Sequence, residues 1–497
     1  MATPESDSIA DRLARASEAA ARKFGVEPAN PARIDDALGG AISPQKLVDN
    51  LAEVWRTSPE EARSVLEQHG FGSLLARLQS GESAARREEV QGPPLCMTPI
   101  LRLARDAISI RAWNPMFNDP VTASGELQDS VKTILEAFLP TAQKDVLGVL
   151  YRERPAAYAD RFLTTDAPKI DEYVRKHFGK TPPKYLVNSG IGANEQFNYF
   201  VAALANQRPN RHTTWLLANS PKEVATLLAD ATIENTLFME FSRSGITEET
   251  VKLHELTPRS ARRVVFANAG PLKELGERDG NLVLELPSEV SGRYGRNKTP
   301  ILLAPMYVAG LDVRSYWATI QAACDGMPLS DRASPPVILA QYLRLQQLRR
   351  GVNHIYLGTN DARLRFSGDE FCQFWNEGVN RDGNDITMSR YLGLPRDSHM
   401  NLEAILGTSE RKMAIFLLRA RGDESHPLLL QAADPVRPEH RGLTANDVDL
   451  ILALANVQRC SEKMPTLLIA VSDVNLDASA WLGQLWADTT LVYSRLI

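Results

Sequence analysis

Residues 235–250 read NTLFMEFSRSGITEET, and this stretch decides the fold. A short apolar run ends in a loop that contains Ser and Gly, and a polar segment with helical character follows at once. The same order of strand and helix recurs on both sides of it. The neighbouring apolar runs are KYLVNSG, HTTWLLANS, RRVVFANAG and NLVLELPS, and the other helical segments are NEQFNYFVAALANQ, PKEVATLLADA and PLKELGERDG. This alternation predicts βαβ units and a parallel sheet with helices packed on it.

A second set of strands and helices follows a Pro pair at residues 335–336. The helical segment VILAQYLRLQQLRRG leads to the apolar runs NHIYLGT, ITMSRYLGL, KMAIFLLRA and PTLLIAVSD. The 497 residues, 43% of them hydrophobic, suffice for two or three domains. We therefore predict an α/β protein with two doubly wound parallel-sheet domains. The predicted parts are a helical N-terminal region and linker at 1–94, a helical region at 95–180, and the α/β domains at 181–325 and 326–497.

Charge and hydropathy exclude several classes of partner. A formal net charge of -5 and a pI near 6.0 give no overall positive field, so nucleic acid and an anionic membrane surface are not expected partners. No apolar run reaches the length of a membrane span, and the N-terminus lacks the uninterrupted apolar core of a signal peptide. We therefore expect a cytoplasmic protein. An organellar transit peptide is the alternative, although Asp7, Asp11 and Glu18 argue against it.

The four cysteines, Cys96, Cys324, Cys372 and Cys460, are far apart in the sequence. None has the C-x-x-C spacing or a neighbouring histidine that would indicate zinc, and a reducing compartment accounts for them. We expect neither a metal nor another cofactor. No G-x-G-x-x-G opens a strand-to-helix turn, which argues against a nucleotide-dependent oxidoreductase.

The loop that follows the quoted strand has the composition of an anion site. Ser242, Ser244 and Thr247 present three hydroxyl groups within six residues, and Gly245 permits a tight turn among them. The following helix directs the positive end of its dipole to the same place. A plain helix cap at Thr247 is the alternative, but Thr250 stands where a reciprocal capping box needs glutamate or glutamine. The hydroxyl groups favour a phosphate-binding loop without a P-loop lysine.

A second loop, VNSGIGAN at residues 187–194, also lies between a predicted strand and a predicted helix. Gly190 and Gly192 would let the backbone approach a ligand closely. Ligands of open parallel sheets bind outside the carboxyl ends of the strands, which is where both loops fall. Turns of this kind are common, however, so packing alone explains this one at least as well.

The residues of these loops resemble a known family. FSRSGITEET resembles the phosphate-binding segment of sugar isomerase (SIS) domains, and the whole arrangement is similar to the glucose-6-phosphate isomerase family. Later segments resemble that family's signatures in the family's order. They are SGRYGRNKTPILLAP at 291–305, EFCQFWNEGVNRDG at 370–383 and LGLPRDSHMNLEAIL at 392–406. The resemblance implies tandem SIS domains.

The resemblance implies an aldose–ketose isomerase that converts glucose 6-phosphate to fructose 6-phosphate through a cis-enediol. It assigns Glu377 as the base, Arg293 as the group that stabilises the enediol, and His399 as the residue that helps to open the sugar ring. In the family this histidine comes from the partner subunit, which implies a homodimer. The implied substrate-binding residues are Gly190, Gly192, Asn194, Ser242, Arg243, Ser244, Thr247 and Gln373. Gln373 lies one helical turn before Glu377, so their side chains should share a face.

Each of the three residues Glu377, Arg293 and His399, taken alone, is better explained as a surface or capping residue. Their joint occurrence at positions that resemble the family's favours the catalytic assignment instead. The sequence also departs from the family pattern. Asn194 stands where the family usually has serine, and Ser398 and Glu403 stand where it usually has glutamine. The family normally ends in a further helix that brings a lysine into the active site, whereas this chain is expected to stop before it. Two alternatives therefore stay open: a catalytically silent sugar-phosphate sensor or scaffold, and an isomerase of a different anionic sugar.

Overall fold

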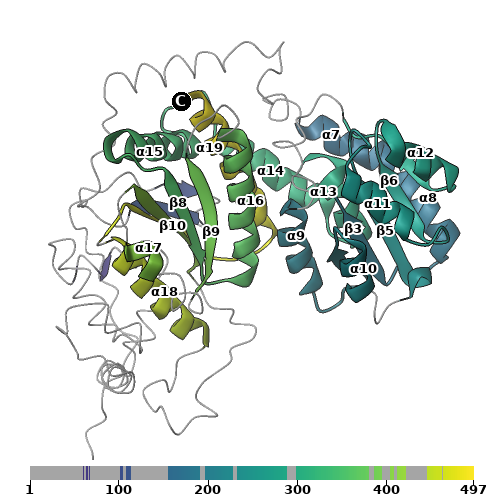
Figure 1. The fold of residues 1–497 in the computed structure, drawn as a ribbon, viewed down its shortest axis with the longest axis horizontal. Helices are drawn as coiled ribbons and strands as arrows, with labels where there is room; N and C mark the ends of the chain where they lie inside the picture. The colour runs from purple at the N-terminus through teal and green to yellow at the C-terminus, as the bar shows by residue number, and fades with distance from the viewer. Residues whose placement is uncertain are drawn as a thin grey trace, which may run out of the picture. The chain divides into compact units, whose positions relative to one another are not determined.

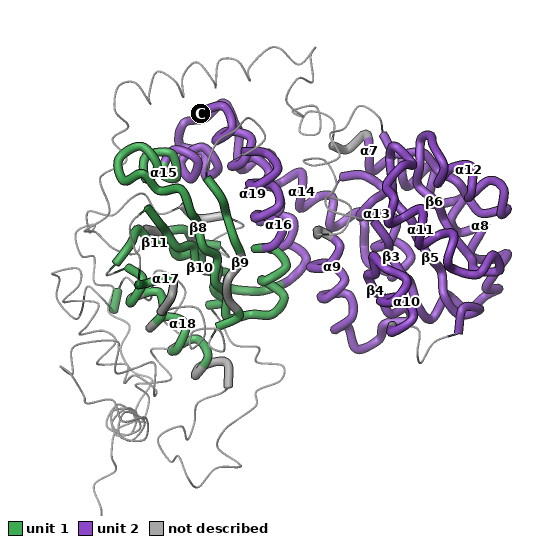
Figure 2. Tube along the Cα trace, in the orientation of Figure 1, with its two compact units in different colours: residues 1–124, 342–368, 385–474 green, residues 125–341, 369–384, 475–497 purple. Residues whose placement is uncertain are grey.

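The structure is a computed structural model of the chain. It describes residues 101–103, 108–112, 155–190, 196–227, 232–287, 298–379, 386–394, 403–407, 411–420, 445–461 and 463–496, together with residues 60, 63, 64 and 67. Apart from these last four, the predicted N-terminal region 1–94 lies outside the described residues. The chain divides into two compact units, each assembled from three stretches (Figure 2). Unit 1 comprises residues 1–124, 342–368 and 385–474, and unit 2 comprises residues 125–341, 369–384 and 475–497.

Unit 2 is built on a five-stranded parallel sheet in the order β4-β3-β5-β6-β7 (Figure 1). Its strands are β3 (Tyr185–Ser189), β4 (Thr214–Leu217), β5 (Thr236–Phe241), β6 (Arg262–Phe266) and β7 (Leu282–Leu284). The connecting helices are α9 (Gln196–Asn206), α10 (Pro221–Leu227), α11 (Glu248–Leu256) and α12 (Gly270–Arg278), with the short 3-10 helix η5 (Ile233–Asn235) before β5. Every residue of β5 is buried, which explains why its sequence is a continuous apolar run. The predicted doubly wound fold is confirmed.

The strand order creates a switch point in this sheet. The chain runs from β3 outward to β4 and then crosses to β5 on the other side of β3. The carboxyl ends of β3 and β5 are therefore neighbours, and the register pairs Ser189 with Glu240. Ligands of open parallel sheets bind in the crevice outside such a point, so the loops after β3 and β5 lie together where a ligand is expected.

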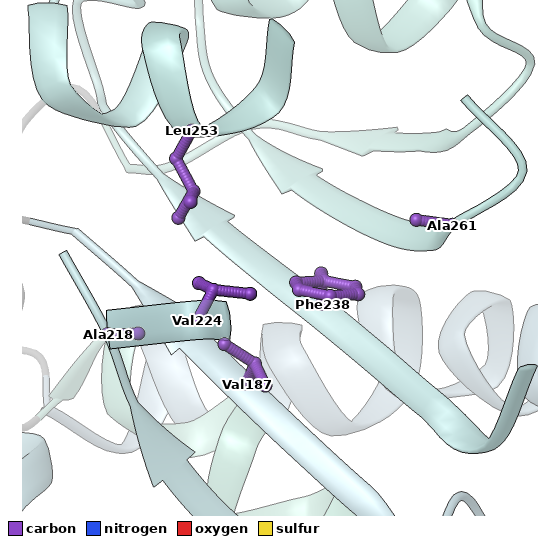
Figure 3. Close-up of a cluster of buried hydrophobic side chains, with 6 residues drawn as sticks. All are labelled: Val187, Ala218, Val224, Phe238, Leu253 and Ala261. Carbon is purple, nitrogen blue, oxygen red and sulfur yellow. The ribbon is translucent and has the colours of Figure 1, made fainter. Parts of the chain in front are cut away.

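The helices that cover one face of the sheet are held by a compact apolar cluster (Figure 3). Phe238 of β5 is fully buried, and Leu253 of α11 packs into the same cluster. Full burial of a side chain of this size stabilises the fold by about 1.5–3 kcal/mol relative to exposure. The other members are Val187, Ala218, Val224 and Ala261. The cluster fixes α11, and with it the loop that leads into that helix.

Further helices complete unit 2. They are α7 (Pro155–Arg161), the π-helix η3 (Phe162–Asp166), α8 (Ala167–Phe178), α13 (Pro300–Val308), α14 (Val313–Gly326) and α19 (Leu476–Leu496), with parts of α15 (Pro335–Arg350) and α16 (Ala362–Val379). The helix α19 is 21 residues long. Stacking of Phe371 on Trp486, with ring centroids 4.2 Å apart, holds it against the second half of α16. The sequence of α19 contains no lysine.

Unit 1 contains a six-stranded sheet in the order β1-β2-β11-β10-β8-β9. Its parallel part comprises β8 (His354–Thr359), β9 (Thr387–Gly393), β10 (Lys412–Arg419) and β11 (Thr466–Val471), accompanied by α17 (Glu403–Gly407) and α18 (Ala445–Ser461). The strands β1 (Leu101–Leu103) and β2 (Ile108–Ala112) extend it in antiparallel fashion beyond β11. No described helix is both long and apolar enough to cross a membrane.

The strands β1 and β2 correct the prediction of a helical region at 95–180. Residues 108–112 read ISIRA, and the buried Ile108 and Ile110 alternate with polar positions, which is the period of a strand. Five residues are too few for this pattern to stand out in the sequence. The strands of the unit 2 sheet lie within the predicted domain 181–325, and the parallel strands of the unit 1 sheet lie within the predicted domain 326–497. Each compact unit, however, is assembled from three separate stretches of the chain.

Candidate functional site

The loop after β5 is held rigidly against the start of α12. The Ser242 backbone N–H donates to Phe266 O at 3.0 Å, and Leu272 N–H donates to Gly245 O at 3.0 Å. Gly245 has a φ of 70°, and a Cβ built on it would lie 1.7 Å from Ala269 O. Only glycine fits this position, because any side chain would collide with the backbone of the next loop. The tight turn predicted at Gly245 is therefore present.

Two of the predicted hydroxyl groups meet at the entrance of α11. The hydroxyl oxygens of Ser242 and Thr247 lie 2.7 Å apart, and the Thr247 backbone N–H donates to Ser242 Oγ at 3.3 Å. Thr247 occupies the N-cap position, yet its side chain makes no hydrogen bond to the helix. The plain-cap alternative is therefore wrong, because this hydroxyl is used in the loop. Arg243 and Ser244, also predicted to bind substrate, are exposed to solvent.

Thr250 is a member of this site that the sequence analysis used only to exclude a capping box. It lies in the first turn of α11, three residues after Thr247, so the two side chains share a face of the helix. Its side chain is buried, and among the described residues its hydroxyl has no hydrogen-bond partner. The backbone N–H groups of a first helical turn also have no partner within the helix. The start of α11 thus offers hydrogen-bond donors, among them the buried Thr250 hydroxyl, that a bound anion would satisfy.

The carboxyl end of β3 brings further polar groups to the switch point. Asn188 and Ser189 are each 1% exposed, and within the described part of the chain neither side chain has a hydrogen-bond partner. A buried polar group without a partner is costly, and the hydroxyl groups of a ligand would satisfy it. Sequence reasoning concentrated on the adjacent Gly190, which is buried. The sequence signal that could have identified Asn188 and Ser189 is that they are two polar residues at the end of an otherwise apolar strand.

The predicted base and its neighbour are paired on α16. Gln373 Nε2 donates a hydrogen bond to Glu377 Oε1 at 2.8 Å, and both side chains are half-buried. The shared helical face was predicted from their spacing of one turn. Stacking of Phe371 on Trp486 and contact of Trp375 with Tyr493 fix this half of the helix on α19. The carboxylate therefore sits on a firmly held element of unit 2, the unit that contains the Ser242 loop.

Four predicted site residues, Gly192, Asn194, Arg293 and His399, lie outside the described residues. Their places in the site stay predictions. Within the described part of the chain, no group of three or more His, Cys, Asp or Glu side chains is arranged to hold a metal ion.

A buried charge cluster lies beneath the Ser242 loop. Glu240, two residues before Ser242, accepts a 2.6 Å hydrogen bond from His254 Nδ1 of α11. His254 Nε2 lies 3.3 Å from Asp279 Oδ2, and Arg263 Nε lies 3.3 Å from Glu240 Oε1. The hydrogen bond from Arg278, followed by that from His254, lowers the pKa of Asp279 to about 2. This cluster ties α11 to β5 and to the end of α12, so it fixes the helix whose first turn carries the hydroxyl groups.

Comparison with known proteins shows relatives in sequence and in fold. No protein-family model matches the sequence. The chain is 27% identical over 256 residues to a probable glucose-6-phosphate isomerase of Haloarcula marismortui, which covers 49% of this chain and 57% of that protein. It is 25% identical over 264 residues to the glucose-6-phosphate isomerase of Carboxydothermus hydrogenoformans, which covers 47% of this chain and 56% of the relative. The chain thus spans a little over half the length of these curated relatives.

Solved structures show the same fold. A glucose-6-phosphate isomerase from Chlamydia trachomatis superimposes with a TM-score of 0.60 at 14% identity, over 81% of this chain and 85% of the other. At this identity the likeness concerns the fold alone. The chain is therefore similar to glucose-6-phosphate isomerases in sequence over about half of its length and in fold over most of it.

Proposed function

We propose that this chain is an aldose–ketose isomerase of a sugar phosphate, with glucose 6-phosphate and fructose 6-phosphate as its substrate pair. The observation that carries the proposal is the pairing of Ser242 and Thr247 at the start of α11, beside the polar end of β3. A phosphate dianion placed there would accept hydrogen bonds from these hydroxyls, from Thr250 and from first-turn amides. The names of the curated relatives support the same substrate class.

The proposed chemistry needs one base that moves a proton between C2 and C1 of the open-chain sugar. Glu377 is the proposed base, and the hydrogen bond from Gln373 orients its carboxylate. The electron pair of the C2–H bond forms the C1–C2 double bond of the cis-enediol, while negative charge develops on O1 and the proton resides on Glu377. Transfer of the O2 proton to O1, with formation of the C2 carbonyl, and return of the proton from Glu377 to C1 give the ketose. Arg293 is proposed to stabilise the developing charge and His399 to help open the ring.

Conversion of fructose 6-phosphate to glucose 6-phosphate by the purified chain tests the proposal. Glu377→Gln should lower kcat by about 10²–10⁴-fold, the usual contribution of a positioned base. Glu172→Gln, at an exposed position of α8, is the matched control and should leave kcat unchanged. In D2O the product should carry solvent deuterium at the carbon that receives the proton. A wild-type chain no faster than the Glu377→Gln variant would end the proposal.

A silent sugar-phosphate-binding protein is the second candidate. The departures from the family pattern at Ser398 and Glu403 favour it, since the family usually has glutamine at both positions. Binding of fructose 6-phosphate without turnover, measured by calorimetry, would select it. Turnover of another phosphorylated sugar but not of this pair would instead select the different-substrate isomerase.

The proposal also includes a homodimer and a cytoplasmic location in carbohydrate metabolism, as the resemblance implies. If His399 is donated by the partner subunit, the active site is complete only in the dimer. Sedimentation of the purified chain at micromolar concentration measures this directly, and a monomer with full activity would exclude the shared site.

A further inference from the structure

The Ser242 loop, residues 242–247, has two halves that are held by different parts of unit 2. Its first half is fixed to the start of α12, because Leu272 N–H donates to Gly245 O at 3.0 Å. Its second half leads into α11, whose N-cap is Thr247. The halves meet where the hydroxyl oxygens of Ser242 and Thr247 lie 2.7 Å apart. This contact therefore depends on the position of α11 relative to the end of β5.

Apolar packing alone does not fix the position of α11. Leu253 packs into the cluster that contains Phe238 (Figure 3), and Val251 packs against a second cluster that includes Leu272 of α12. Hydrophobic contact is non-directional, so it permits small shifts of a helix along its own axis. A binding site needs its groups held to within about 0.5 Å. The start of α11 therefore needs a directional contact with β5.

His254 supplies such a contact. It lies in the last turn of α11, and its Nδ1 donates a hydrogen bond to Glu240 Oε2 at 2.6 Å. Glu240 belongs to β5 and lies two residues before Ser242. The bond therefore joins the strand that enters the Ser242 loop to the helix that leaves it. Both side chains have 0% exposure, so water does not compete for the bond.

The second ring nitrogen of His254 contacts a different element. Nε2 lies 3.3 Å from Oδ2 of Asp279, which directly follows α12 at the end of that helix away from the Ser242 loop. An ionised carboxylate only accepts hydrogen bonds, so both ring nitrogens act as donors. Asp279 also accepts two hydrogen bonds from Arg278, and Arg263 Nε lies 3.3 Å from Glu240 Oε1. Each carboxylate thus has a cation besides His254, and what His254 adds is direction.

The chemistry of this contact favours a role in position over a role in stability. Buried ion pairs add little net stability, because the cost of removing the charges from water offsets their attraction. A satisfied buried polar network does, however, restrict the elements that it joins to one arrangement. Glu240 interrupts the otherwise apolar stretch LFMEF of β5 directly before the Ser242 loop. The restriction is therefore imposed where the loop begins.

We propose that His254 is a positioning residue of the phosphate site and acts through its hydrogen bond to Glu240. This inference rests on the proposed function and names the contact that determines the affinity of the Ser242 loop for phosphate. The bond fixes α11 relative to β5, so that the Thr247 hydroxyl and the first-turn N–H groups lie where the phosphate oxygens bind. The contact with Asp279 contributes to the stability of unit 2 and not to phosphate affinity. His254 itself is enclosed and does not contact the substrate.

Two amide substitutions separate the two contacts of His254. Asparagine places its amide nitrogen near the position of Nδ1, so His254→Asn keeps a donor for Glu240 and loses the contact with Asp279. Glutamine is one methylene longer and reaches the position of Nε2, so His254→Gln keeps a donor for Asp279 and loses the bond to Glu240. Each variant loses one buried hydrogen bond, so both should be less stable than wild type in urea unfolding. Only His254→Gln should bind inorganic phosphate more weakly in calorimetry, by about 10-fold, the cost of one hydrogen bond to a charged group.

Steady-state kinetics provide a readout that a loss of stability does not change. His254→Gln should raise the KM for fructose 6-phosphate by about 10-fold and keep kcat within about two-fold of wild type, the pattern expected when substrate and transition state lose the same binding contact. A partly unfolded variant would instead show a lower kcat at unchanged KM, because its folded fraction would be normal. His254→Asn should keep the wild-type KM. Equal phosphate affinity of the two variants, or a fall in kcat alone, would overturn the proposal.

If His254→Gln does not fold, Glu240→Gln weakens the same bond from the carboxylate side, and Asp279→Asn is its matched control. Glu240→Gln should weaken phosphate binding and Asp279→Asn should not, and equal effects would refute the role of His254. A wild-type chain that binds phosphate without turnover would end the proposed isomerase activity alone, because calorimetry still decides the role of His254. A wild-type chain that does not bind phosphate would overturn both proposals.

Discussion

Substitution of Gly245 by alanine tests whether the loops after β5 and β6 are interlocked. Gly245 and Gly179 both have a positive φ, of 70° and 71° respectively. Their surroundings differ completely. A Cβ at Gly245 would lie 1.7 Å from Ala269 O, whereas a Cβ at Gly179 would have no atom within 4 Å. Gly179→Ala therefore reports the cost of a positive φ without a collision, and Gly245→Ala adds the collision.

The expected magnitudes follow from these two contributions. Holding a residue with a Cβ in a sparsely populated region of positive φ costs about 1–3 kcal/mol, which is the expected loss for Gly179→Ala. Forcing an extra carbon into a filled position costs about 1–3 kcal/mol more, because here a backbone carbonyl must move. Gly245→Ala should therefore reduce the free energy of unfolding by about 2–6 kcal/mol.

Urea unfolding followed by tryptophan fluorescence measures both variants in the same transition, because both glycines belong to unit 2. Gly245→Ala should also lose the thermal shift that inorganic phosphate causes, since Ala269 can move only if the Ser242 turn moves with it. Gly179→Ala should keep this shift. Equal destabilisation by the two substitutions would refute the argument that the loops are interlocked.

Three further predictions concern the site. Thr247→Val removes the hydroxyl that pairs with Ser242 and should weaken phosphate binding by about 5–10-fold, as expected for the loss of one hydrogen bond. Thr226→Val, at an exposed position of α10, is the control and should leave phosphate binding unchanged. Calorimetry measures the phosphate affinity of the two variants. Because the pKa of Asp279 is lowered to about 2, its ionised form stabilises the folded state above pH 4, and this stability is lost as the pH falls toward 2. Asp279→Asn should flatten that dependence in urea unfolding at pH 5, 4 and 3, and an unchanged slope would contradict the assignment. Finally, mixing inactive Glu377→Gln and His399→Ala chains and allowing subunits to exchange should restore about a quarter of wild-type activity if each site uses both subunits, and none if it does not.

The local sequence pattern was sufficient to predict the strand, loop and helix at residues 235–250. An apolar run, a loop that contains Ser and Gly, and a polar segment with helical character follow one another there. The pairing of Gln373 with Glu377 was also predictable, since it depends only on helical spacing. The order of the strands could not be predicted from the sequence. That β5 lies beside β3, and that residues 108–112 join the sheet of unit 1, depends on packing between distant parts of the chain.

Burial was the main property that the sequence could not reveal. Asn188, Ser189 and Thr250 look like ordinary surface residues until the structure encloses them without partners. Lys298 likewise looks like a solvated charge in a polar segment, and only its bond to Gln484, 186 positions away, shows that it is interior. The cost of an enclosed polar group is a tertiary property, so no local pattern predicts it.

The discontinuity of unit 2 has a consequence for biosynthesis. Its five strands leave the ribosome long before α19, yet the rings of Trp486 and Tyr493 cover Phe371 and Trp375 in the finished unit. A nascent chain must therefore carry these aromatic surfaces uncovered while unit 1 is being made, and it can complete its first sheet domain only after translation has passed through the second.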